Sequence, residues 1–425
     1  MKTERKPPVK GNGKAAAKPV KKSSCRYGER VFAEGVSISN DTRATGLNNN
    51  DLICGKSGCG KTGGYVIPNI QQIDGSMVVS DTKGQLARRF RGELESKGYH
   101  VHTIDLVDMT RSCGYNPLDF IRRHEDGSYY GQDVLALAKL LCPQQDQKEP
   151  IWDQCTQMYL SFLIAYCLET EDPEDQNLIT VAELHRIYSG RDGSIPFAAW
   201  VNEHPKSFAS KKYRELETNR LAEKMWSSIM GFVNTNLAPF DFPEAEIVFA
   251  SKEPFDLGLL GREKTVLFLN VSDTDRSLDA IINMIYSQIL HVLCYQADKK
   301  PDGRLAVPVR IILDDFAASA TIPDFDKIIS VIRSRDIYVS VVIQSVSQLD
   351  SMYGDAASRT ILNNCDHILF MGSQDRITAD YIASRAMKTV ETIYAMPIDK
   401  IYLITAGERA QLVQKITPYS TTNDY

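Results

Sequence analysis

The sequence lacks the patterns of a disulfide scaffold, a zinc site and a membrane-spanning segment. Its nine cysteines are an odd number, and none lies in a C-x-x-C pair. The least charged helical stretch, residues 154–168, has 15 residues, whereas a membrane span needs about 20 apolar ones. The N-terminus also lacks the apolar segment of a secretory signal. We therefore expect reduced thiols and no transmembrane helix.

A large excess of positive charge is absent as well. The formal net charge of −5 argues against a small DNA-binding domain, in which basic residues dominate the whole fold. The first 22 residues nevertheless carry eight Lys or Arg and one Glu, which leaves −12 for the remainder. We interpret residues 1–26 as a disordered basic tail, and attraction of this tail to anionic lipid or DNA is an alternative. Any contact with nucleic acid must be local.

The 425 residues amount to about three domain lengths, and 43% of them are hydrophobic. Short apolar runs between turn residues predict strands that are covered on both faces of a parallel sheet. These runs are residues 51–54, 77–80, 100–104, 265–270, 309–313, 338–343, 367–371 and 400–405. The fold class is therefore α/β with a mainly parallel central sheet.

Helical spacing dominates between residues 121 and 245. We expect a buried helix over 151–168, a second one capped by Thr180 with Glu183 and ending near Gly190, and a third over 218–235. This pattern predicts an all-α insertion at 121–245, which separates a first part of the α/β domain (27–120) from a second part (246–425).

One segment matches the phosphate-binding pattern G-x-x-x-x-G-K-[ST] in full and follows a strand-like run. It consists of Gly55, Lys56, Ser57, Gly58, Cys59, Gly60, Lys61 and Thr62. Glycines let backbone N–H groups converge on phosphate oxygens, the lysine reaches the β- and γ-phosphates, and the threonine hydroxyl binds Mg²⁺. We predict binding of ATP with Mg²⁺. The alternative is a glycine-rich turn before a helix.

A magnesium site also needs a carboxylate at the end of a neighbouring strand. Two apolar runs stop at an acid, one at Asp81 and one at Asp314 and Asp315. We favour Asp314 as the metal ligand and Asp315 as the residue that orients the attacking water; capping of a following helix is the alternative. Gln344, at the tip of the next predicted strand, is a candidate sensor of the γ-phosphate or an ordinary polar strand end.

Arg333 and Arg335 precede that last strand. An arginine supplied by a neighbouring subunit can stabilise the charge that develops on a transferred phosphoryl group. Surface ion pairs with nearby acids are the alternative interpretation of both residues.

With these residues in place, the chain resembles the coupling-protein ATPases of conjugative type IV secretion, the TraG-like family. The resemblance covers about residues 45–416. It rests on the blocks 45–48 (TGLN), 65–69 (YVIPN), 79–84 (VSDTKG), 115–118 (YNPL), 313–317 (LDDFA), 322–325 (IPDF), 332–335 (IRSR), 344–345 (QS) and 364–366 (NCD).

The resemblance implies a RecA-like nucleotide-binding domain interrupted by an all-α domain. It implies a homo-oligomeric ring, a hexamer, on the cytoplasmic side of the bacterial membrane. The ring would receive single-stranded DNA bound to a relaxase and transfer it into a type IV secretion channel, driven by ATP hydrolysis. By position, Lys61 and Thr62 hold phosphate and Mg²⁺, Asp314 is the metal-side acid, and Asp315 stands where the family usually has Glu. Gln344 is the sensor, and Arg333 or Arg335 acts in trans.

Three departures from the family pattern leave other functions open. Family members usually have N-terminal transmembrane helices, which this sequence does not show, so we expect a soluble or peripherally associated protein. Asp315 replaces the usual Glu, and Thr82 the usual Pro. One alternative is a weakly hydrolysing, nucleotide-gated receptor or adaptor for secretion substrates. Another is a DNA translocase of the chromosome-segregation type.

Overall fold

The computed structural model describes residues 27–416 except 144–149, 221–222, 273 and 317–320. The basic tail predicted for residues 1–26 lies outside the described residues. Within the described part of the chain, none of the helices is both long and apolar enough to cross a membrane.

Nine strands of the described residues form one sheet in the order β11-β10-β9-β3-β8-β7-β4-β6-β5. Neighbouring strands are parallel from β9 to β5, whereas β10 runs antiparallel to both β9 and β11. The bounds are β3 (Asp51–Cys54), β4 (Ser76–Ser80), β5 (His100–Asp105), β6 (Thr265–Asn270), β7 (Val309–Leu313), β8 (Ile337–Ile343), β9 (His367–Phe370), β10 (Lys400–Thr405) and β11 (Gln411–Gln414). All eight predicted strands are present, and the α/β class is confirmed.

Both faces of the sheet are covered, as the unbroken apolar runs predicted. Successive residues of one strand point to opposite faces, so Leu52 packs into one hydrophobic cluster and Ile53 into the other. Helices α12 (Asp279–Asp298), α14 (Val346–Asn363) and α15 (Arg376–Ala386) supply residues to the first cluster. Helices α2 (Ile67–Gln71) and α3 (Gln85–Ser96) supply residues to the second.

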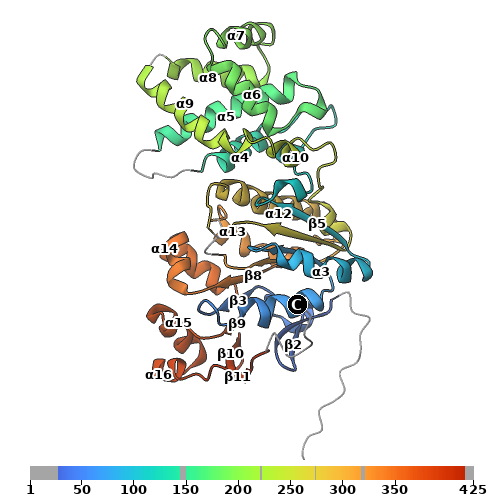
Figure 1. The fold of residues 1–425 in the computed structure, drawn as a ribbon, viewed down its shortest axis with the longest axis vertical. Coiled ribbons are helices and arrows are strands. Elements are labelled where there is room, and N and C mark those ends of the chain that lie inside the picture. The colour runs from blue at the N-terminus through green and yellow to red at the C-terminus, as the bar shows by residue number, and fades with distance from the viewer. Residues whose placement is uncertain (1–26, 144–149, 221–222, 273, 317–320, 417–425) are drawn as a thin grey trace, which may run out of the picture.

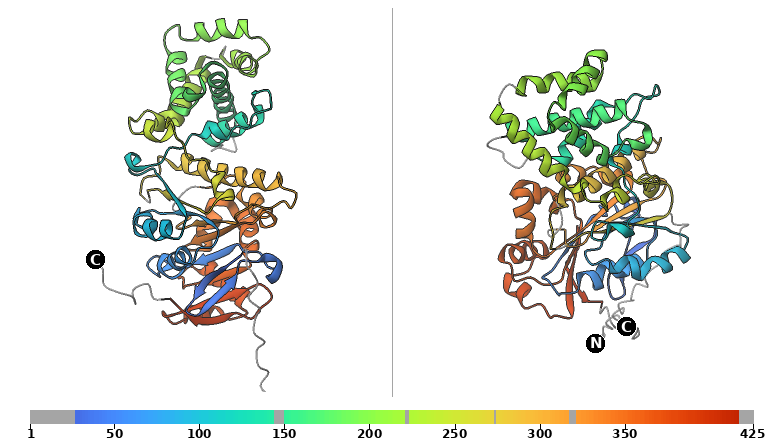
Figure 2. Two further views of the ribbon diagram at one scale, coloured as in Figure 1. Left: turned by 90° about the vertical axis from the view of Figure 1, so that its right-hand side faces the viewer. Right: turned by 45° about the horizontal axis from the view of Figure 1, so that its top comes forward.

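A cluster of helices lies beyond the β5 edge of the sheet, and β10 and β11 lie at the opposite end of the molecule (Figure 1; Figure 2). The cluster consists of helices α4 (Gly131–Leu141), α5 (Ile151–Thr170), α6 (Leu178–Ser189), α7 (Ser194–Glu203), α8 (Phe208–Arg220), α9 (Glu223–Leu237) and α10 (Ala245–Phe249). Aromatic rings fill its centre, with the Phe162 ring 5.3 to 5.9 Å from those of Tyr188, Phe197 and Tyr213. The domain borders at 120 and 245 stay a prediction.

Two details of the predicted helices are wrong. The N-cap of α6 is Asn177, whose side-chain oxygen accepts the Thr180 N–H at 3.0 Å, so Thr180 lies inside the helix. Leu178 and Ile179 are buried and bring the helix start forward. The stretch 218–235 contains the end of α8, which ends at Arg220, and most of α9, which begins at Glu223.

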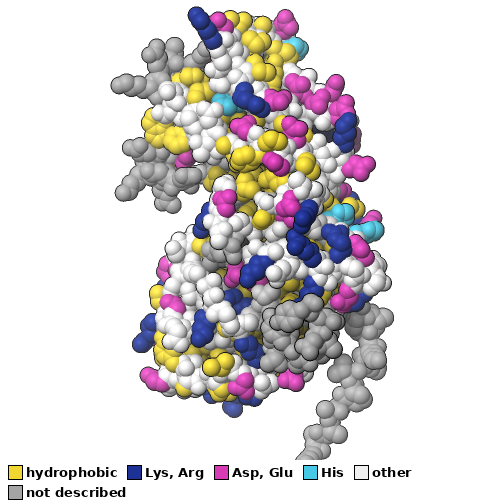
Figure 3. Space-filling view, in the orientation of Figure 1, with side chains coloured by type: hydrophobic (Ala, Val, Ile, Leu, Met, Phe, Trp, Pro, Cys, Tyr) yellow, Lys and Arg dark blue, Asp and Glu magenta, His cyan; other side chains and the backbone are white. Residues whose placement is uncertain are grey.

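The remaining elements are short. Strands β1 (Glu29–Ala33) and β2 (Val36–Ser39) form an antiparallel hairpin that the sequence did not predict, and β11 is a further unpredicted strand. The short helices are α1 (Thr42–Thr45), α11 (Leu259–Arg262), α13 (Phe325–Ile329) and α16 (Val390–Tyr394). Acidic and basic side chains intermingle over the face drawn in Figure 3, so this face carries no single dominant charge.

Candidate functional site

The predicted phosphate loop joins the end of β3 to a π-helical turn, Thr62–Val66, that continues into α2. Gly58 and Gly60 have φ values of +73° and +85°, which favour glycine because it has no Cβ. Two backbone bonds hold the start of the loop. The Gly55 N–H donates to Ile343 O of β8 at 3.1 Å, and the Lys56 N–H donates to Gly372 O after β9 at 2.9 Å.

Lys61 and Thr62 lie where the loop becomes helical. The buried ammonium of Lys61 donates to the Gly55 carbonyl oxygen at 2.9 Å and lies 3.9 Å from Asp315 Oδ1. The Thr62 hydroxyl donates to Asp314 Oδ2 at 2.7 Å. The structure thus brings the loop together with both acids at the end of β7, which come from a segment 252 residues away.

Burial raises the pKa of Asp314 to about 6, and the Thr62 hydroxyl bond opposes this rise. A hydroxyl and a carboxylate in contact are oxygen donors of the kind that Mg²⁺ prefers. The residues present therefore fit a divalent cation. Among the described residues, the two oxygens of Asp314 accept from Thr62 and from the Asp315 N–H, and neither accepts from the start of a helix.

Asp315 differs from Asp314 in exposure and backbone. Its side chain is 37% exposed, and its φ of +47° is in the left-handed region that few residues other than glycine adopt. Such conformations cost about 1–3 kcal/mol and gather at functional sites. The backbone thus turns at Asp315 and leaves its carboxylate next to Lys61, where it can meet a phosphate or a water molecule.

Asp81, the other acid at a strand end, caps a helix. Its carboxylate accepts the backbone N–H groups of Gln85, Leu86 and Ala87 at 2.8 to 3.2 Å, at the start of α3. Three N–H donors at a helix start are a typical use of an aspartate. Of the two strand ends that carry an acid, the end of β7 contacts the phosphate loop, through Asp314 and Asp315.

Gln344 follows directly after β8, whose last residue, Ile343, accepts the Gly55 N–H. It is half-buried. Gln344 thus lies at the same edge of the sheet as the phosphate loop and the two acids.

Arg333 and Arg335 do not join this group. They lie in a 3₁₀ turn, Ile332–Arg335, before β8, and therefore at the opposite edge of the sheet. Arg335 forms a fork with both carboxylate oxygens of Asp298, at 2.8 and 3.0 Å. Arg333 donates one hydrogen bond, 2.7 Å long, to Gly46 O. The ion-pair interpretation of these arginines thus holds for Arg335.

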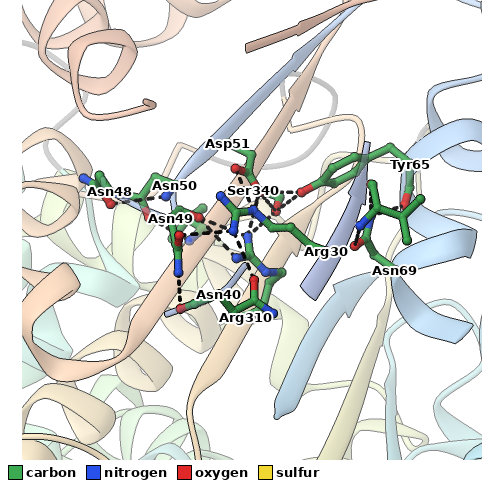
Figure 4. A network of polar contacts seen from close by, with 12 residues as sticks. Arg30, Asn40, Asn48, Asn49, Asn50, Asp51, Tyr65, Asn69, Arg310 and Ser340 are labelled. Atoms are coloured by element: carbon green, nitrogen blue, oxygen red, sulfur yellow. Dashed lines mark hydrogen bonds and ion pairs between the residues drawn. The ribbon is translucent and has the colours of Figure 1, made fainter. Parts of the chain in front are cut away.

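A buried polar network at the start of β3 was not predicted (Figure 4). Asp51 accepts from Arg30 Nε at 2.9 and 3.1 Å, from Arg310 Nη1 at 2.9 Å and from the Tyr65 hydroxyl at 2.6 Å. The Ser340 hydroxyl lies 2.8 Å from that of Tyr65. Since Tyr65 belongs to the π-helical turn after the phosphate loop, the network ties this turn to β1, β3, β7 and β8.

Lys415, which the sequence did not single out, also lies at the phosphate loop. Its ammonium donates to the Cys59 carbonyl oxygen. A lone lysine after the last apolar run offers no signal of this placement, because only the folding of β11 against β10 brings it there.

The chain is similar in sequence to known proteins. A family model described as type IV secretory system conjugative DNA transfer matches residues 14–407. Protein VirD4 of Agrobacterium fabrum is 22% identical over 346 residues, which are 78% of this chain and 48% of VirD4. Protein VirD4 of Rhizobium radiobacter is 23% identical over 346 residues, 78% of this chain and 47% of that protein. The chain spans about half the length of these curated relatives.

Solved structures of the bacterial conjugative coupling protein TrwB have the same fold. The unbound form, TrwBdeltaN70, is 14% identical with a TM-score of 0.65, over 93% of this chain and 89% of TrwB. TrwB has also been solved with the non-hydrolysable ATP analogue ADPNP and with ADP and Mg²⁺, each at a TM-score of 0.65 and 14% identity over 92% of this chain and 89% of TrwB. The predicted RecA-like architecture is confirmed by this similarity.

Proposed function

Because this chain belongs to the type IV secretory system conjugative DNA transfer family, we propose that it is a coupling protein that hydrolyses ATP to drive DNA transfer. The proposed cargo is single-stranded DNA bound to a relaxase, and the proposed destination is a type IV secretion channel. The proposed cofactors are ATP and Mg²⁺, as in the TrwB structures that hold an ATP analogue or ADP with Mg²⁺.

One observation carries the nucleotide part of the proposal. The Thr62 hydroxyl and the Asp314 carboxylate are in contact at 2.7 Å. The ammonium of the preceding residue, Lys61, donates to the Gly55 carbonyl of the same loop. In this arrangement Lys61 binds the β- and γ-phosphates, and Thr62 and Asp314 hold Mg²⁺. A bound Mg²⁺ neutralises the charge that develops on the phosphate oxygens.

Asp315 and Gln344 are the proposed catalytic residues of the same subunit. Asp315 is the partly exposed carboxylate nearest to Lys61. It accepts a proton from the water that attacks the γ-phosphorus. The bond between this phosphorus and the β–γ bridging oxygen breaks, and ADP leaves with the electron pair of that bond. Gln344 lies at the adjacent strand end and senses the γ-phosphate through its amide.

An arginine from a neighbouring subunit completes the proposed site. The seven residues of β8 (Ile337–Ile343) separate Arg333 from the loop edge, a span of roughly 20 Å at 3.3 Å per residue. Neither arginine can therefore reach the phosphate loop of its own chain, and in the proposed ring this edge would lie against a neighbouring subunit. We favour Arg333, because Arg335 is held by Asp298. A hexameric ring is the proposed assembly.

The other parts of the proposal concern the layout of the chain and its place in the cell. We propose that residues 27–120 and 246–425 form the nucleotide-binding domain and that residues 121–245 form the inserted all-α domain. The proposed location is the cytoplasmic side of the bacterial membrane, where the relaxase and the secretion channel meet. The family match is to conjugative transfer, so chromosome segregation is not proposed further.

ATP turnover with and without single-stranded DNA tests this function. We expect measurable hydrolysis that rises with DNA and falls to background in Lys61→Ala. Lys327→Ala is the matched control, because the Lys327 side chain is 75% exposed and pairs with Asp324. Wild-type turnover no higher than that of Lys61→Ala would exclude a motor.

A nucleotide-gated receptor that hydrolyses ATP weakly is the second candidate, and Asp315 favours it. Aspartate is one methylene shorter than glutamate, so its carboxylate reaches less far toward an attacking water. The left-handed backbone at this position sets the direction in which the side chain leaves the chain. The variant Asp315→Glu separates the two functions. A large gain in turnover supports the receptor, whereas a loss indicates that the native aspartate is already the working base.

A further inference from the structure

The residues after β11 are held firmly against the rest of the sheet. The Lys415 N–H donates to Asp399 O at 3.0 Å, and the carbonyl of Gln414 accepts the Glu34 N–H at 3.1 Å. The Gln414 side chain also donates to Asp399 O at 3.0 Å and accepts from Lys400 Nζ at 2.8 Å. Lys415 therefore starts from a backbone position that several hydrogen bonds fix.

From this position Lys415 reaches the phosphate loop from outside. Its ammonium donates to the Cys59 carbonyl, and its Cε lies 3.5 Å from the place that a Cβ on Gly60 would occupy. The carbonyl oxygen of Ile416 lies 3.6 Å from the corresponding place at Gly64. The segment 415–416 thus runs along the Gly60 and Gly64 side of the loop.

The other side of the loop faces the acids. Thr62 contacts Asp314 at the end of β7, and Gln344 follows β8. A triphosphate with its γ-phosphate beside these residues must lead its remaining phosphates and nucleoside away from β7 and β8. Gly60, Gly64 and Lys415 lie on the side away from these strands, toward β9 to β11.

Two lysine ammonium groups therefore donate to carbonyl oxygens of one short loop. Lys61 bonds the Gly55 carbonyl from within the loop, and Lys415 bonds the Cys59 carbonyl from the C-terminal segment. A carbonyl is a weaker partner for an ammonium than a phosphate oxygen, which carries a full negative charge. Lys415 is half-buried, and its long side chain can rotate to exchange one partner for the other.

We propose that Lys415 binds the α- and β-phosphates of the nucleotide and so extends the phosphate site to a second segment of the chain. This inference rests on the proposed ATP binding. Because both ATP and ADP carry these phosphates, Lys415 strengthens the binding of substrate and product alike, and it acts on affinity more than on the chemical step.

The dissociation constants of Mg·ATP and Mg·ADP, measured by calorimetry on the full chain, test this inference. Lys415→Met keeps the aliphatic stem and removes the ammonium. We expect it to weaken both nucleotides by about tenfold, and to raise KM with little change in kcat. Lys415→Arg keeps a cation and should stay within about threefold of wild type.

Lys327→Met is the matched control, because the Lys327 side chain is 75% exposed and pairs with Asp324. Wild-type affinity for both nucleotides in Lys415→Met, or an equal loss in Lys327→Met, overturns the role of Lys415. If Lys415→Met does not fold, Lys415→Gln is held to the same expectation. If Lys61→Ala weakens binding and Lys415→Met does not, this inference alone fails; if the wild type binds neither nucleotide, the proposed ATPase fails with it.

Discussion

Strand β3 has a polar group at each end, and the two groups use the same residue types differently. At its start, Asp51 is fully buried and bonded to Arg30, Arg310 and Tyr65. After its end, Lys61 bonds a backbone carbonyl, and its nearest carboxylate, Asp315, is 37% exposed at 3.9 Å. At the start of the strand the charged groups pair with one another, whereas the charged groups of the loop are not tightly paired and are free to bind a ligand.

The difference follows from the cost of burying charge. A buried ion pair repays its desolvation only when its hydrogen bonds are satisfied and well directed. The Asp51 carboxylate meets this condition, since two arginines and two hydroxyl groups donate to it, whereas Nη2 of Arg30 is buried without a hydrogen-bond partner among the described residues. Burial, with Asp51 nearby, raises the pKa of Tyr65 and keeps its hydroxyl a donor. We therefore expect variants of the network to change stability, and variants of the loop to change nucleotide affinity.

The largest effect is expected for Asp51→Ala. Removing the carboxylate leaves the buried guanidinium groups of Arg30 and Arg310 without their counter-charge, which typically costs about 3–5 kcal/mol. Urea unfolding at pH 7 measures this loss. In the exposed pair Arg91 and Glu95, with 42% and 51% of the side chains exposed, Glu95→Ala should cost less than about 1 kcal/mol. Equal costs in the two variants would contradict the comparison.

Lys61→Ala is the counterpart at the loop. We expect it to weaken Mg·ATP binding by about a hundredfold, or about 2.7 kcal/mol, because the proposed role of the ammonium is to bind two phosphates. The free energy of unfolding should change by less than about 1 kcal/mol, since the lysine bonds only loop carbonyls strongly. Both quantities are measured on one preparation, with Lys327→Ala as control, because Lys327 is 75% exposed. A stability loss as large as that of Asp51→Ala would show that the loop lysine also holds the fold.

The third effect depends on pH. His367 lies opposite Asp51 on β9, is fully buried, and neither of its ring nitrogens has a partner among the described residues. Burial lowers its pKa to about 4, whereas an unfolded histidine titrates near 6.5. Below pH 6.5 the unfolded chain binds a proton that the folded chain does not, so stability falls as the pH falls toward 4.

From pH 7 to pH 5 this titration costs roughly 2 kcal/mol at about 1.4 kcal/mol per pH unit. Urea unfolding at both pH values compares the wild type with His367→Gln, which does not titrate. The variant should lose less stability over this interval. An identical pH dependence would place the cause elsewhere.

Local patterns predicted the elements whose physics is local. The eight strands were found because Val, Ile and Leu fill both faces of a covered sheet. The loop at 55–62 could be picked out because its spacing is contiguous, and its contact with Asp314 could be expected because parallel strands end at one edge; their binding of phosphate and metal stays a prediction. The hairpin β1 and β2 was missed, since its strands are short and one of them contains the buried Arg30.

Contacts between distant segments could not be predicted in this way. Arg30, Asp51 and Arg310 come from three strands, and Asp51 and Arg310 are 259 residues apart. Lys415 meets Cys59 over 356 residues. No sequence motif links residues that lie so far apart in the chain, and an isolated arginine or lysine usually indicates a solvated surface. The N-cap of α6 was misplaced for a related reason, because the burial of Leu178 and Ile179 decides where the helix begins.

Tyr65→Phe gives the smallest expected effect and tests whether the two ends of β3 are independent. It removes the hydroxyl that contacts Asp51 at 2.6 Å and Ser340 at 2.8 Å, while Asp51 keeps both arginines, so stability should fall by about 1 kcal/mol. The loop has its own supports, the bond from Gly64 N–H to Gly60 O at 2.8 Å among them. We therefore expect the Mg·ATP dissociation constant to stay within about twofold of wild type. A larger rise in a folded variant would mean that the network sets the position of the phosphate loop through Tyr65, and that stability and affinity are coupled.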